Sequence, residues 1–146
     1  MLFRLLRSDD PALTLEYARA REAYGDLSAA GATLEASLKT NPNQFPARLL
    51  LGKIYFRSGN PDAALDQLED AALLQPENVE AKTELARVLV TQNKFSDAVE
   101  LLEPMAASSN DADVFALLGQ AYRGLGRLKE AQRAEARAQA LRQTRK

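Results

Sequence analysis

Small, apolar and turn-forming residues recur along this chain every 33 or 34 positions. Gly52, Ala86 and Gly119 form one column of small residues, and Ala18 stands one period earlier. Three further columns hold alanine, apolar residues and turn residues (Ala30, Ala64, Ala98, Ala131; Leu27, Pro61, Phe95, Leu128; Gly25, Gly59, Asn93, Gly126). A period of roughly 20–50 residues is the signature of a repeat protein, so each period predicts one structural unit.

The pattern within one period predicts two helices joined by a tight turn. Residues 46–58 place apolar side chains at helical spacing (Leu50, Leu51, Ile54, Tyr55). Gly59 supplies the left-handed residue that ends this helix, and Asn60 with Pro61 begins the next one. A second apolar stripe follows and stops before Pro76, because proline disfavours helix in the residue that precedes it.

The columns of small residues have a mechanical reason. Gly52 and Ala64 are expected where the two helices of a hairpin cross, and a larger side chain there would cost about 1–3 kcal/mol through overpacking. A single hairpin cannot bury both of its faces, so neighbouring hairpins must stack. The sequence therefore predicts an all-α stack of hairpins.

The residues Leu51-Gly52-x-x-Tyr55-x-x-x-Gly59-x-Pro61-x-x-Ala64-x-x-x-Leu68 resemble the tetratricopeptide repeat motif, as do Leu118-Gly119-x-x-Tyr122 and the residues after them. The resemblance extends over about residues 12–141 and implies a right-handed α-solenoid of about four repeats with a polar C-terminal cap helix. The repeats are expected at about 11–44, 45–78, 79–111 and 112–144, after an N-terminal apolar segment or cap at 1–10 and before a tail at 145–146. The first is the weakest, with Arg21 where tyrosine or leucine usually stands.

The same resemblance implies that the first helix of each hairpin lines a concave groove. The residues expected in that groove combine cationic and apolar side chains (Arg19, Leu49, Lys53, Phe56, Arg57, Arg87, Val90, Gln120, Arg123). Arg19, Lys53 and Arg87 would form a basic ladder at one-repeat spacing. Such a surface suits a peptide or helix of a partner protein with acidic and apolar side chains, because arginine binds carboxylates in a fixed geometry.

A second interpretation of these charges stays open at this stage. Periodic charges on helices are commonly a solvated face, and Glu16, Glu22, Glu80 and Glu84 lie within helical reach of the bases. Some members of the family clamp a C-terminal carboxylate with lysine and asparagine. Leu15 and Arg19 stand at those positions here, which argues against that function.

Composition narrows the function further. The chain has 146 residues with 46% apolar and 27% charged residues, which is typical of a globular domain. It contains neither cysteine nor histidine, so cysteine nucleophiles, the commonest general base and the commonest metal ligand are missing. We therefore expect a non-enzymatic protein with no metal or cofactor, which acts as an interaction module or scaffold within a multiprotein assembly.

The charge is unevenly spread, although the formal net charge is only −1. Residues 123–146 hold eight basic and two acidic residues, which gives about +6 and leaves about −7 for the rest. The tail lacks interleaved aromatic residues, which argues against nucleic acid. No stretch approaches the roughly 20 apolar residues of a membrane span, so we expect a cytoplasmic protein, or a periplasmic one if an export signal is missing. The alternative function is a structural, self-associating subunit that uses the apolar residues Leu2, Phe3, Leu5 and Leu6 and the ends of the solenoid.

Overall fold

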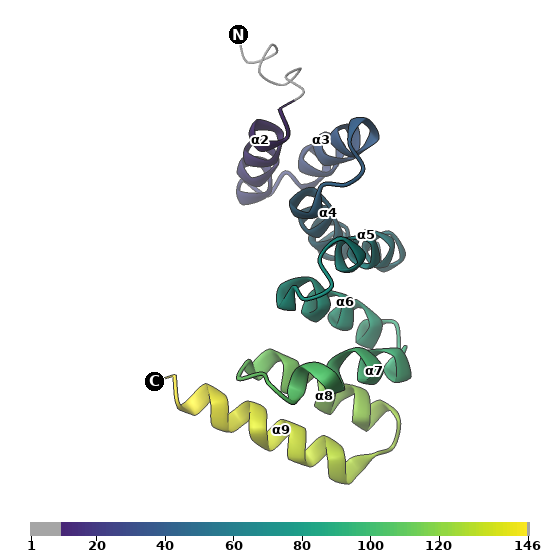
Figure 1. Cartoon of the computed structure of the whole chain (residues 1–146), viewed down its shortest axis with the longest axis vertical. Coiled ribbons are helices and arrows are strands. Elements are labelled where there is room, and N and C mark those ends of the chain that lie inside the picture. The colour runs from purple at the N-terminus through teal and green to yellow at the C-terminus, as the bar shows by residue number, and fades with distance from the viewer. Residues whose placement is uncertain (1–9, 146) are drawn as a thin grey trace. The chain divides into compact units, whose positions relative to one another are not determined.

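The computed structural model describes residues 10–145, and the apolar segment expected at the N-terminus lies almost wholly outside them. Within this range the chain forms eight α-helices and no strand (Figure 1). The helices are α2 (Pro11–Ala23), α3 (Leu27–Thr40), α4 (Phe45–Arg57), α5 (Pro61–Leu74), α6 (Val79–Thr91), α7 (Phe95–Ala106), α8 (Ala112–Gly124) and α9 (Leu128–Gln143). The all-α prediction is confirmed, and each predicted hairpin corresponds to one pair of helices.

The helices begin and end where the sequence places caps and turn residues. Asn60 is the N-cap of α5, where its side chain accepts a hydrogen bond from the Ala63 backbone, and Pro61 is the first helical residue. The turn column adopts left-handed backbone at all four positions, with φ of 80° at Gly25, 78° at Gly59, 60° at Asn93 and 75° at Gly126. The backbone conformation of the turns therefore recurs with the same period as the sequence.

The chain divides into two compact units, the first ending at Glu77 and the second beginning at Asn78. In the first unit, α4 packs on the hairpin of α2 and α3 and pairs with α5. The column of small residues lies at the centre, where Ala18, Ala30 and Ala64 have no exposed surface. Leu34, Leu51 and Ile54 fill the space beside them and are at most 1% exposed.

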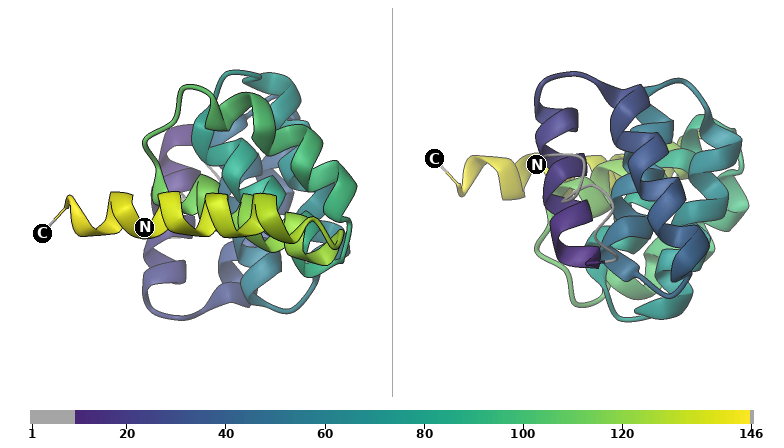
Figure 2. Two further views of the ribbon diagram at one scale, coloured as in Figure 1. Left: turned by 90° about the horizontal axis from the view of Figure 1, so that it is seen from below. Right: turned by 90° about the horizontal axis from the view of Figure 1, so that it is seen from above.

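The second unit repeats this packing with α6 and α7 followed by α8 and α9. Ala86, Ala98 and Ala131 are fully buried, and Leu102 and Val114 complete the interior. The left view of Figure 2 looks onto α9, and no other helix of the second unit lies in front of it. The exposed residues of α9 are mostly polar (Lys129, Gln132, Arg133, Arg137, Gln139, Arg142), so it forms the polar C-terminal helix that the sequence predicts.

One column changes character in the last hairpin. Leu34, Leu68 and Leu102 are fully buried, but Glu135 takes the corresponding place in α9 and is partly exposed. Its carboxylate binds Arg123 of α8 through two contacts of 2.7 Å. The leucine that three hairpins bury at this position is thus replaced in the last hairpin by an ion pair between its two helices.

Candidate ligand-binding surface

In the first unit, four of the predicted groove residues reach the surface. Arg19 and Arg57 are exposed, and Lys53 and Phe56 are half-buried. Leu49 differs, because only 9% of its surface is exposed and it belongs to the core. The first unit therefore presents mainly cationic side chains beside one accessible apolar ring.

In the second unit, α6 and α8 carry the remaining predicted residues. Arg87 and Val90 on α6 are half-buried, whereas Gln120 and Arg123 on α8 are exposed. The apolar and cationic character that the sequence predicts is thus present in each unit, although its extent differs from residue to residue.

Several of these cations are paired within the protein. Arg57 contacts Glu22 at 2.6 Å, which joins α4 to α2. Arg87 lies 3.4 Å from Glu84 on its own helix and 3.7 Å from Asp113 of α8. Neighbouring acidic residues therefore neutralise some of the predicted groove cations, as in the second interpretation of these charges. Glu22 is bound to Arg57 and not to Arg19.

The energies of these pairs decide whether they exclude a ligand. The side chains of Arg57 and Arg123 are 51% and 57% exposed, and exposed pairs contribute only about 0–1 kcal/mol. A ligand carboxylate can replace the internal one at little cost. Arg19 makes no ion pair with any other residue between 10 and 145, so among the predicted groove cations it is the one most available to a partner.

Sequence reasoning missed a polar link that recurs between consecutive hairpins. The Tyr55 hydroxyl of α4 donates to Glu35 of α3, and the Tyr122 hydroxyl of α8 donates to Glu103 of α7 at 2.6 Å. Burial, followed by the bond to the carboxylate, raises the pKa of each tyrosine to about 12. Glu35 and Glu103 occupy the same place in their repeats, and this regularity is the signal that could have revealed the link.

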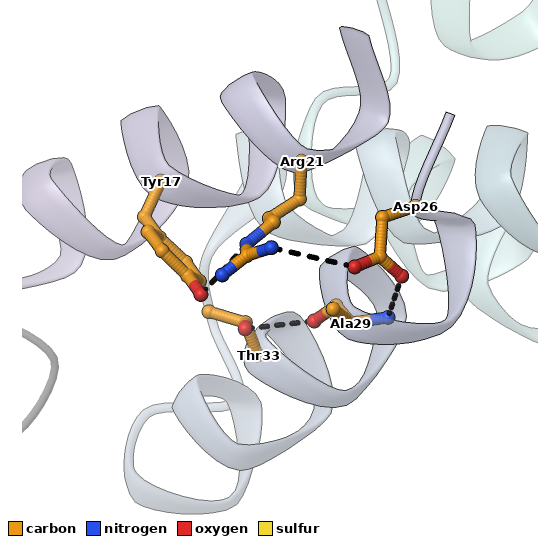
Figure 3. A network of polar contacts seen from close by, with 5 residues as sticks. All are labelled: Tyr17, Arg21, Asp26, Ala29 and Thr33. Atoms are coloured by element: carbon orange, nitrogen blue, oxygen red, sulfur yellow. Dashed lines mark hydrogen bonds and ion pairs between the residues drawn. The ribbon is translucent and has the colours of Figure 1, made fainter. Parts of the chain in front are cut away.

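The weak first repeat uses a different polar network at the same place (Figure 3). Arg21, which stands where the second and fourth hairpins carry Tyr55 and Tyr122, donates from Nε to the Tyr17 hydroxyl at 2.8 Å and lies 3.5 Å from Asp26. Asp26 also accepts from the Ala29 backbone and caps α3. The departure from the motif is therefore compensated locally, and the first hairpin still forms.

Sequence reasoning also missed a pocket on the second unit, between α8 and α9. Its floor consists of Phe115, Leu118, Tyr122 and Ala134. None of these residues belongs to the predicted groove. The motif identifies Leu118 and Tyr122 as core residues, and it carries no signal that a space remains beside them.

The described residues hold no group of three or more acidic side chains arranged to bind a metal ion. Among helices α2 to α9, none combines the length and the apolar character that crossing a membrane requires.

Hairpins with small residues at the helix crossing and left-handed turns at a fixed period define a helical-repeat protein of the interaction-scaffold class. One tetratricopeptide repeat model matches residues 22–75 and residues 55–121, and a second model of the same repeat matches residues 112–143. The chain belongs to the tetratricopeptide repeat family.

This chain is also similar to individual proteins in sequence or in structure. The chain is 32% identical over 95 residues to Protein FlbA of Caulobacter vibrioides, covering 65% of this chain and 16% of FlbA. It therefore spans only a small part of that relative. Among solved structures, MamA AMB-1 matches with a TM-score of 0.86 at 22% identity over 95% of this chain and 83% of that chain. MamA from Desulfovibrio magneticus RS-1 matches with a TM-score of 0.82 at 23% identity, covering 89% and 74% of the two chains.

Proposed function

We propose that this protein is a non-catalytic scaffold that binds a peptide or helix of a partner protein along the first helices of its hairpins. The observation that carries the proposal is the accessible, mixed surface of these helices. Phe56 and Val90 stay half-exposed beside cations although the opposite side of each helix is buried. Apolar side chains next to arginine suit a partner segment that carries both apolar and acidic residues.

The experiment compares partner recovery by the wild type and a variant of the first unit. Arg19→Glu combined with Phe56→Gln removes one unpaired cation and the accessible ring. Arg87 is left unchanged, because a glutamate there would break the contacts of Arg87 with Glu84 and with Asp113 of α8.

Lys39→Glu is the matched control, because it makes the same charge change on α3, outside the predicted groove. Purified proteins on beads are incubated with extract of the native organism, and bound proteins are quantified by mass spectrometry. We expect the double variant to lose specific partners that the wild type and Lys39→Glu retain. Equal recovery by all three proteins would remove the proposal for this unit.

The second candidate function is a self-associating structural subunit. It is favoured by apolar surface at the start of the described chain, where Leu13 is 45% exposed and Tyr24 is 90% exposed. Sedimentation of the whole chain, of a version without residues 1–7 and of Leu13→Gln/Tyr24→Ser tests this candidate. A wild type that stays monomeric over the accessible concentration range would end it.

A further inference from the structure

The pocket between α8 and α9 has the features of a second, separate binding site. Its volume is about 250 Å³, and most of its lining is apolar. All lining residues belong to the second unit and to one hairpin. A space of this size accommodates one bulky side chain, whereas sites for whole drug-sized molecules usually span about 300–1,000 Å³.

The floor of the pocket is held in place by buried contacts. Leu118, Tyr122 and Ala134 are at most 8% exposed. The hydroxyl of Tyr122 is bound to Glu103 at 2.6 Å, which fixes the ring. Phe115 is half-buried and completes the apolar floor at the surface. The pocket is therefore preformed and needs no rearrangement of its floor to receive an apolar group.

The rim of the pocket carries positive charge that the protein itself does not neutralise. Arg133 and Arg137 are exposed, follow one another at a spacing of four on α9, and make no ion pair within the described part of the chain. Arg137 lies over the Phe115 ring at 5.8 Å and donates only a long bond of 3.4 Å to Asn110. Two like charges at this spacing repel each other, so a carboxylate placed between them is favoured.

Arg127, in the same hairpin, differs from Arg133 and Arg137 because its charge is paired within the protein. It binds Glu130, lies 3.6 Å from Glu103 and stacks on the Tyr122 ring at 4.6 Å. Glu130 also lines the pocket, but its carboxylate forms an ion pair with Arg127. Arg133 and Arg137 are therefore the cations of the pocket lining that have no carboxylate partner among the described residues.

We propose that the α8–α9 pocket binds a protein segment in which a phenylalanine or leucine is flanked by acidic residues. The apolar side chain enters the pocket over Leu118 and Ala134, and the flanking carboxylates bind Arg133 and Arg137. This site lies outside the predicted groove, so one scaffold would hold two partner segments at once.

The probe is the synthetic peptide acetyl-Gly-Asp-Asp-Phe-Asp-Asp-Gly-amide, titrated into the whole ¹⁵N-labelled chain. Two control peptides replace the central phenylalanine by alanine, or all four aspartates by asparagine. The protein variants are Arg133→Glu/Arg137→Glu and the control Lys129→Glu/Arg145→Glu, which makes the same change of charge on exposed residues outside the pocket lining. Circular dichroism of each variant verifies that the helices remain.

We expect saturable shifts of the amides of Phe115, Leu118 and Ala134 at peptide concentrations up to about 2 mM, the range of single-side-chain affinities. Arg133→Glu/Arg137→Glu should weaken binding about tenfold or more, since carboxylates then meet like charge, and each control peptide should bind more weakly than the probe. Absence of shifts at the pocket, or equal weakening by the control variant, would overturn the proposal. Shifts confined to the surroundings of Arg19 and Phe56 would also overturn it while leaving the proposed groove intact.

Discussion

Gly52→Ala provides a sharp test of the close helix crossing. A Cβ placed on Gly52 would lie 2.6 Å from Cγ and 2.8 Å from Cδ2 of Leu68, closer than packed carbon atoms can approach. Leu68 is fully buried, so it cannot move aside without displacing its own neighbours. Overpacking of this kind costs about 1–3 kcal/mol, whereas alanine gains up to about 1 kcal/mol in helix propensity. With the full gain in helix propensity, the expected net loss in the free energy of unfolding is about 0–2 kcal/mol.

Two other glycines serve as controls for this variant. Gly31 is also buried within a helix, but a Cβ there would lie 3.7 Å from Ile54 and 3.8 Å from Leu51, at ordinary contact distance. Gly31→Ala should therefore stabilise the protein by about 0.5–1 kcal/mol through helix propensity alone. Gly119→Ala should lie between the two, because the atom it meets at 2.8 Å belongs to the flexible, half-exposed side chain of Glu135.

The measurement is urea denaturation of the three variants, followed by circular dichroism at the helix band. The hairpin of α6 and α7 carries alanine, Ala86, at the crossing and still forms, so a hairpin can accommodate a Cβ there. This comparison limits the expected loss for Gly52→Ala to the lower part of the overpacking range. If Gly52→Ala and Gly31→Ala change stability with the same sign, the inference that Gly52 is required by the crossing is wrong.

Three further predictions follow from single residues. Asn93 has a φ of 60°, so Asn93→Ala should cost about 1–2 kcal/mol, while Asn93→Gly should change stability far less; urea denaturation distinguishes them. Burial and the bond to Glu103 raise the pKa of Tyr122 to about 12, so the stability that its protonated form contributes should be complete below about pH 10 and lost between about pH 10 and 12. The absorbance difference at the phenolate band between wild type and Tyr122→Phe measures this ionisation, and a midpoint near pH 10 would contradict the buried hydrogen bond. Glu135→Leu should increase self-association in sedimentation, because it replaces the Arg123 pair with exposed apolar surface; sedimentation identical to that of the wild type would refute this reasoning.

The fold was predictable because its determinants are local and repeat. Close helix crossings require small residues, and left-handed turns require glycine or asparagine. Each requirement is local, so a period of 33 or 34 residues in the sequence recurs in the backbone. Leu27, Pro61, Phe95 and Leu128, which form one column, are the first residues of α3, α5, α7 and α9. The tertiary packing agrees with these local preferences.

The exposure and pairing of the predicted groove residues were predictable only in part. The positions of the core residues determine which face of each helix is exposed. Arg19 and Gln120 lie on the exposed face, as the sequence predicts. The pairing of Arg57 with Glu22, 35 positions away, depends on side-chain reach across two helices, which spacing alone does not determine. The α8–α9 pocket depends on an unfilled volume, and no sequence pattern encodes a volume directly.

Site-specific photo-crosslinking in the native organism tests the central claim most directly. A photoreactive residue replaces Arg19 or Gln120 on the first helices of two hairpins, or the controls Lys39 and Glu100 on second helices, all four of which are exposed. A scaffold that binds through its first helices should give discrete protein adducts from positions 19 and 120 and none of the same adducts from 39 and 100. Adducts of equal yield at all four positions, or adducts at the controls alone, would contradict the account.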